Sequence, residues 1–207
     1  MRIKNAFTFL LLLFATQVVN AQNNADAIIR VLVDQIKSHK NIDMAFSYQL
    51  SSDGENLGNS EKGHAWIQGE AYKIEMAEQQ TISDGKTIWS YLVDEKEVMI
   101  SNATDGTENT PLKLLTSLDK NYAATLTNFD SQGIASIELA NPKGQYKRIT
   151  LKINTKKNEL RSVDIYMEDN SKLVVNVEEM KYDQVLDDKF FTFDTKKHPR
   201  VDVIDMR

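Results

Sequence analysis

The stretch Ile82–Tyr91, ISDGKTIWSY, decides the fold of this chain. It holds an Asp-Gly pair between two short runs that contain β-branched and aromatic residues. Such a pair favours the tight turn that joins two antiparallel strands. Residues 80–83 and 86–93 are therefore predicted to form a β-hairpin.

The same two-residue alternation extends to both sides of this hairpin. Residues 42–50 carry a large apolar side chain at every second position, as a half-buried strand does. Short polar stretches and turn dipeptides separate further runs of this kind, and about ten or eleven antiparallel strands are expected. The other predicted strands lie near residues 62–68, 71–78, 96–101, 124–129, 133–140, 146–153, 160–168, 171–180 and 190–194.

Two segments interrupt the alternation with helical spacing. Residues 26–39 place apolar side chains three and four positions apart, which predicts one amphipathic helix. Thr110 and Pro111 suit the N-cap and the first turn of a second, shorter helix over residues 110–118.

These elements predict an α+β fold: a strongly curved antiparallel sheet, or open half-barrel, with helices covering the concave face. Two helices cannot cover so wide a sheet on both sides, so both are expected on one face, inside the curve. No repeat or linker divides residues 22–207, which are expected to form one domain.

The first residues predict export. Arg2 and Lys4 precede an apolar run that contains four leucines in a row, and residues 19–21 suit cleavage by a signal peptidase. An apolar run this short is typical of a signal peptide rather than a membrane-spanning helix. Residues 1–21 are therefore expected to be removed, which would leave a soluble periplasmic protein that begins at Gln22.

Composition narrows the function. The formal net charge is −5 and falls to near −7 once residues 1–21 are removed, which disfavours nucleic acid as a partner. The chain has no cysteine, so disulfides, thiol catalysis and a lipid-anchored N-terminal cysteine are excluded. A monomer that stays dissolved between membranes is expected.

Catalytic and metal-binding patterns are missing from the sequence. His39, His64 and His198 are far apart and lack metal-ligand spacing. Glu178 and Glu179 are neighbours in a predicted strand, so their side chains are expected to point to opposite faces. The sequence therefore predicts no catalytic residue, no metal site, no cofactor and no enzymatic activity.

The chain does carry a surplus of large apolar side chains at alternate strand positions. These residues could line an apolar cavity, and methionine suits such a wall because its side chain is flexible and polarizable. They could equally fill a core under the two helices, and composition alone does not distinguish the two. The candidate lining residues are Phe46, Tyr48, Leu50, Trp66, Tyr72, Ile74, Met76, Trp89, Tyr91, Leu112 and Leu115.

Several motifs resemble one family. Residues 82–91 resemble the SDGKTLW-Y hairpin of LolA, the carrier of outer-membrane lipoproteins. Residues 109–112, NTPL, are similar to the start of that family's central helix. Weaker matches, in the same order and spacing, are Gly63–Trp66, Phe191–Phe193 and Val201–Asp205.

The resemblance implies an open half-barrel with an acyl-binding cavity between the sheet and its helices. It also implies acylated lipoproteins as cargo, an inner-membrane ATP-driven lipoprotein exporter as donor and an outer-membrane acceptor. The alternative is a periplasmic lipid-binding or stress-sensing module built on the same half-barrel.

One departure from the family pattern concerns the covering helices. The family is expected to carry an Arg followed by a Pro shortly after Trp66, where the Arg ties the sheet to those helices. Residues 66–72, WIQGEAY, contain neither. The contact that holds the helices over the sheet is therefore expected to be made differently here.

Overall fold

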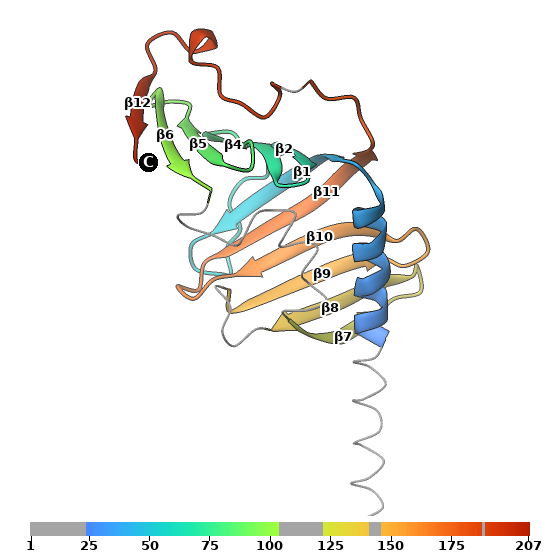
Figure 1. Ribbon diagram of the computed structural model, residues 1–207. Helices are drawn as coiled ribbons and strands as arrows, with labels where there is room; N and C mark the ends of the chain where they lie inside the picture. Colours follow the sequence, from blue (N-terminus) through green and yellow to red (C-terminus); the bar gives the residue numbers. More distant parts are fainter. Residues whose placement is uncertain (1–23, 104–121, 141–145, 188) are drawn as a thin grey trace, which may run out of the picture.

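The computed structural model describes residues 24–103, 122–140, 146–187 and 189–207. Their strands form one twelve-stranded sheet with the order β12-β6-β5-β4-β3-β2-β1-β11-β10-β9-β8-β7. Its end strands, β12 and β7, are not paired with each other, so the sheet is open (Figure 1). The prediction of a single large, open and mainly antiparallel sheet is confirmed.

Two antiparallel meanders make up most of the sheet. In the first, the chain passes from β1 outward to β6; in the second, it starts at the other edge with β7 and returns to β11. The first meander consists of β1 (Ile42–Ser51), β2 (Glu61–Gln68), β3 (Ala71–Glu75), β4 (Gln79–Ser83), β5 (Thr87–Leu92) and β6 (Glu97–Asn102). The second consists of β7 (Ala123–Phe129), β8 (Ile134–Ala140), β9 (Arg148–Asn154), β10 (Glu159–Tyr166) and β11 (Lys172–Tyr182).

The C-terminal part departs from the prediction. Residues 190–194 were expected to form a strand, and that expectation is wrong: they form a turn and irregular chain, followed by the short helix η1 (Thr195–Lys197). The chain then adds β12 (Asp202–Asp205) parallel to β6, which brings the sheet to twelve strands. Phe191 and Phe193 are buried by side-chain packing, so their alternation comes from packing rather than from strand pairing.

A helix spans residues 24–38, close to the predicted range of 26–39. Its apolar stripe, which includes Ile29, Leu32 and Val33, forms one buried cluster with residues of β8 and β9 such as Ile137 and Leu151. We call the side of the sheet that it covers the helix face (Figure 1). The second predicted helix, over residues 110–118, lies outside the described residues, so the placement of two helices on a concave face stays a prediction.

A β-bulge lies where the two meanders meet. Ala45 pairs with Glu179 but Phe46 pairs with Val177, so Glu178 is an extra residue on β11. Glu178 and Glu179 are both exposed, whereas their neighbours pack on the helix face. The bulge breaks the two-residue period between Val177 and Met180, so alternation alone does not set the faces of these glutamates, and their placement on opposite faces stays a prediction. Both remain at the surface, and Glu179 forms an ion pair with Lys181.

The segment that joins the helix to β1 is held by a buried asparagine. The Asn41 side chain donates to the carbonyl oxygen of Gln184 at 2.7 Å and accepts from the Gln184 amide at 2.8 Å. Its amide nitrogen also lies 3.3 Å from Oε1 of Gln68, at the end of β2. Next to it, Asp183 accepts from His39 and from the Lys40 backbone amide. Asn41 thus ties the helix end to both meanders.

We predict that Asn41→Ala lowers the free energy of unfolding by about 1–3 kcal/mol, because it removes the hydrogen bonds that the buried Asn41 side chain makes to the Gln184 backbone and to Gln68. Urea unfolding followed by circular dichroism measures this. Asn128→Ala, at an exposed position of β7, is the control and should change stability by less than about 0.5 kcal/mol. Equal effects of the two substitutions would contradict the role assigned to Asn41.

Candidate ligand-binding cavity

An apolar pocket with a cavity volume of about 250 Å³ lies on the helix face, next to the cluster under the helix. Six strands from both meanders contribute to it. Apart from Tyr48, the described residues that line it carry hydrocarbon or thioether side chains. They are Met44, Phe46, Tyr48, Ala65, Ile67, Ile74, Met76, Ile149, Leu151, Leu160, Val163, Ile165, Leu173, Val175 and Val177.

Strand register explains why these side chains converge. Tyr48 pairs with Val175 across the junction of the meanders, and Val175 pairs with Val163. Val163 in turn pairs with Leu151. Directly paired residues point to the same face of a sheet, so alternate apolar residues of successive strands form one continuous apolar surface.

A glycine shapes one wall of the pocket. Phe46 pairs with Gly63, and the Phe46 ring lies where a side chain at that position would stand. A Cβ atom on Gly63 would lie 2.4 Å from two ring carbons and 3.0 Å from the carbonyl oxygen of Glu75. The missing side chain therefore allows the ring to lie over β2.

Tyr48 brings the main polar atom to this wall. Its hydroxyl donates to Oε2 of Glu61 at 2.7 Å and accepts from the backbone amide of Ala77 at 3.2 Å. Burial raises the pKa of Tyr48, and the hydrogen bond to Glu61 raises it further. The hydroxyl is thus fixed and neutral at neutral pH, while the ring stays in the apolar wall.

The structure brings four of the sequence-predicted residues together in the pocket: Phe46, Tyr48, Ile74 and Met76. Tyr72 also lies on the helix face, but it is buried in the cluster under the helix. Leu50 follows Tyr48 on the same face and is 55% exposed, beyond the pocket. Leu112 and Leu115 lie outside the described residues.

Trp66, Trp89 and Tyr91 do not line the pocket. Trp66 pairs with Asp43 and Lys73 on the face opposite the helix, where its ring packs against His64 and Phe190. The prediction that these residues line the cavity is wrong for a simple reason. Alternation shows which residues of one strand share a face, but only the register with the neighbouring strands shows which face that is.

The rings of Trp89 and Tyr91 belong to a second apolar cluster, on this opposite face. It contains Ile82, Val98 and Phe193, and Trp89 and Tyr91 pack against it. The Phe193 ring centroid lies 5.2 Å from that of Tyr91. The residues after β11 thus return over β2 to β6 and cover this part of the sheet (Figure 1).

Sequence reasoning missed the half of the pocket wall that β9, β10 and β11 supply. Residues 149–153 alternate as clearly as residues 42–50, and residues 173–177 are almost all apolar, so the signal for strands was present. Nothing in the sequence, however, shows that β11 pairs with β1. The missed residues of these three strands are Ile149, Leu151, Leu160, Val163, Ile165, Leu173, Val175 and Val177. Met44, Ala65 and Ile67 of the first meander were missed as well.

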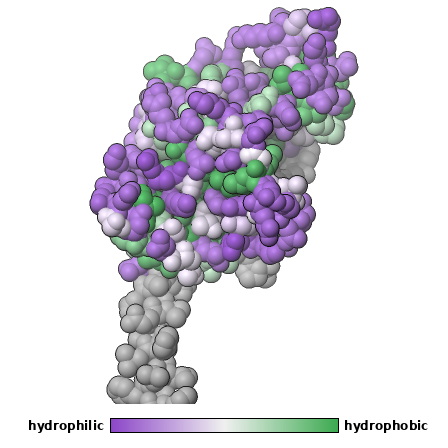
Figure 2. Space-filling model, turned by 180° about the vertical axis from the view of Figure 1, so that it is seen from behind, coloured by the Kyte–Doolittle hydropathy of each residue, from purple (hydrophilic) through white to green (hydrophobic). Residues whose placement is uncertain are grey.

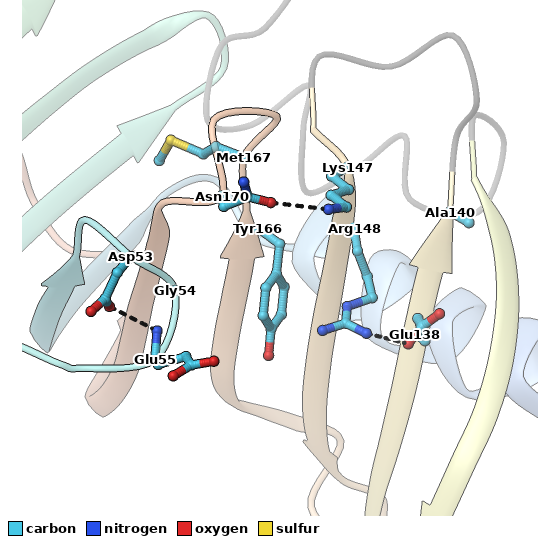
Figure 3. A pocket seen from close by; sticks show the side chains of 10 residues that line it. All are labelled: Asp53, Gly54, Glu55, Glu138, Ala140, Lys147, Arg148, Tyr166, Met167 and Asn170. Atoms are coloured by element: carbon cyan, nitrogen blue, oxygen red, sulfur yellow. Dashed lines mark hydrogen bonds and ion pairs between the residues drawn. The ribbon is translucent and has the colours of Figure 1, made fainter.

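A second, larger pocket of about 450 Å³ opens on the opposite face and is polar (Figure 3). Arg148 of β9 lies over the Tyr166 ring, with its guanidinium carbon 3.9 Å from the ring centre. Its Nη1 lies 3.5 Å from Glu138, and Lys147 donates to Asn170 at 3.2 Å. The Nε atom of Arg148 is buried with no hydrogen-bond partner among the described residues.

Most polar groups of this larger pocket already have partners in the protein. Asp53 accepts hydrogen bonds from Ser51, Glu55 and Asn56, which stabilise its charged form and lower its pKa. Lysine, arginine and carboxylate side chains stand side by side, so no single charge dominates. Seen from behind, this side of the molecule is largely hydrophilic, with small hydrophobic patches (Figure 2). The apolar pocket is therefore the stronger candidate for a ligand.

The described residues that line the two pockets include no arrangement typical of catalysis. His39 and His64 each pair with one aspartate, Asp183 and Asp43, and the His198 ring stacks on Phe193. No group of three potential metal ligands occurs within the described residues. None of the helices in that part of the chain is long and apolar enough to cross a membrane.

A family comparison agrees with this geometry. The model of the family described as outer membrane lipoprotein carrier protein LolA matches residues 39–194, which include every described strand except β12. This chain belongs to the LolA family. Among curated proteins, none matches the sequence of this LolA-family chain.

Solved structures resemble the fold. A conserved, uncharacterized protein of Thermus thermophilus has a TM-score of 0.53 and 11% identity, and the match covers 84% of this chain and 96% of that protein. A LolA superfamily protein of Nitrosomonas europaea scores 0.44 at 12% identity, covering 83% and 98%. LprF of Mycobacterium bovis scores 0.43 at 10% identity, covering 80% and 96%. The likeness to the Thermus protein concerns the fold alone. The other two structures are too distant to support any conclusion about this chain.

We predict that Gly63→Ala lowers the free energy of unfolding by about 1–3 kcal/mol, because the new methyl group collides with the Phe46 ring. Phe46→Leu in the same chain should recover part of this loss; the contact with the Glu75 carbonyl would remain. A double-mutant cycle in urea measures the coupling. Additive effects of the two substitutions would show that the ring does not depend on Gly63.

We also predict that Trp89→Ala loosens the C-terminal segment and leaves the apolar pocket intact. The cost should be about 1–3 kcal/mol, since Trp89 is half-buried against the cluster on the opposite face. Limited proteolysis should cut residues 183–201 faster, while an uncharged apolar dye should bind within about twofold of the unmodified protein. Loss of dye binding without faster cleavage would place Trp89 in the pocket instead.

Proposed function

We propose that this protein is a periplasmic carrier that binds the acyl chains of lipoproteins and ferries them from the inner to the outer membrane. One observation carries the proposal: a chain of the LolA family has an apolar pocket in one face of an open sheet. The proposed action is physical, with no covalent step and no cofactor.

Acyl chains cannot cross an aqueous space unprotected, because their exposure to water costs a large free energy. Each methylene moved from an apolar environment into water costs about 0.8 kcal/mol, so several acyl chains hold a lipoprotein in its membrane almost permanently. A pocket lined by aliphatic side chains replaces the bilayer around part of the cargo. Met44 and Met76 suit a wall that must accept flexible chains, because their side chains are themselves flexible.

The proposed route has two further partners. An ATP-driven exporter in the inner membrane would load the cargo, and an acceptor at the outer membrane would receive it. Residues 1–21 would direct export as a signal peptide and would then be removed. The resulting net charge near −7 would keep the carrier from binding anionic membrane surfaces between loading and delivery.

We predict that Val175→Asp weakens binding of the uncharged dye N-phenyl-1-naphthylamine by at least about tenfold, because it places a carboxylate in the apolar wall. Asn176→Asp is the matched control: it adds the same group one residue further along β11, at an exposed position of the opposite face. A fluorescence titration measures both. Comparable binding by the two variants would contradict the proposed pocket.

The cargo itself can be tested in the periplasm. Protein purified by osmotic shock should carry acylated polypeptides that mass spectrometry detects, and Val175→Asp should carry far less of them than Asn176→Asp. Equal recovery with both variants, or none with the unmodified protein, would argue against the carrier function.

A further inference from the structure

The exposure of the β1 residues on the helix face increases along the strand, so the two ends of the apolar pocket differ. Ile42, beside the helix, is 2% exposed, and Tyr48 is 6% exposed. Leu50, two residues further on the same face, is 55% exposed, and its partner Leu173 is only half-buried. Within the described residues, the pocket is thus closed at the helix end, and exposure begins beyond Tyr48, at Leu50.

The accessible end carries polar groups at fixed positions. Tyr48 pairs with Glu61 across β1 and β2, and its hydroxyl is held between the Glu61 carboxylate and the Ala77 amide. Glu61 is exposed, and the hydrogen bond from Tyr48 involves only its Oε2 atom. An amphiphile whose chain fills the pocket would therefore place its head beside this carboxylate.

The charged groups next to the Tyr48 hydroxyl are carboxylates. Glu61 and Glu78 are the two charged groups that act on the Tyr48 hydroxyl, and both raise its pKa. The nearest lysines along the neighbouring strands, Lys62, Lys73 and Lys172, alternate with residues of the helix face and so lie on the opposite face. There Lys73 and Lys172 pair with Glu75 and Asp164. An anionic head would meet carboxylates here, whereas an amine could form an ion pair.

We propose that Tyr48 and Glu61 form a head-group site that favours acyl cargo bearing a free amine, such as an acylated polypeptide with an unmodified N-terminus, over anionic amphiphiles. The inference rests on the proposed function of the pocket. The Tyr48 hydroxyl fixes one carboxylate oxygen, and the other accepts a hydrogen bond from the ammonium group.

Such a site would solve a problem that an apolar pocket alone leaves open. A hydrocarbon wall binds the acyl chain of a fatty acid or an anionic phospholipid as readily as that of a lipoprotein, because burial of methylenes is non-directional. Repulsion between like charges at the accessible end would reduce occupation by these lipids. The polar head of the ligand would then determine selectivity, and its acyl chain would supply most of the affinity.

Displacement of N-phenyl-1-naphthylamine by three ligands of equal chain length tests the proposal: dodecylamine, monolaurin and laurate, at neutral pH and physiological salt. The unmodified protein should bind dodecylamine about threefold to tenfold more tightly than laurate, as expected of a partly exposed ion pair. Glu61→Gln should bring this ratio close to one. Glu138→Gln, which removes a carboxylate on the opposite face, should keep it.

The outcomes separate the two proposals. Equal binding of amine and laurate by the unmodified protein would overturn the head-group site and leave the carrier function standing. A ratio that survives Glu61→Gln, or that falls equally in Glu138→Gln, would show that net charge rather than Glu61 selects the head. If none of the three ligands displaces the dye, both the carrier function and the head-group site fail.

Discussion

The pairing of β1 with β11 is the interaction on which the rest of this structure depends. It joins the two meanders, and among the described strands no other pair does so. The pocket lies across this junction, with Phe46 and Tyr48 on one side and Val177 and Val175 on the other. The bulge in β11 keeps Val177 and Met180 on the helix face while two glutamates remain in solvent. The pocket can therefore form only when β1 and β11 pair.

The local elements of this fold follow from short-range patterns. The Asp84-Gly85 turn, the alternation in residues 42–50 and the helical spacing in residues 26–39 each depend on neighbours within a few positions, and the structure has the expected elements there. The pocket was predicted only in part. Trp66 and Trp89 belong to strands that were predicted well, yet their faces depend on register with strands that local alternation does not identify.

The second apolar cluster shows another feature that the sequence alone does not predict. Phe191 and Phe193 alternate as strand residues do, but neither lies in a strand. Phe191 is buried, and Phe193 packs against residues of β4, β5 and β6. Apolar side chains on both faces of the first meander have separate tasks. Those on the helix face line the pocket, and those on the opposite face hold the C-terminal segment that leads to β12. When the side chains on both faces of a strand are apolar, the sequence does not show which face lines the pocket and which face binds the C-terminal segment.

The distance in sequence between β1 and its partner has a consequence for how the chain acquires its structure. Ile42 pairs with Tyr182, so 140 positions separate the two ends of this contact. Loops this long close slowly, and folds dominated by such contacts fold slowly. Until β11 arrives, the first meander exposes its apolar face and an unpaired β1 edge, both of which promote aggregation. The first meander would thus need protection from aggregation until β11 pairs with β1.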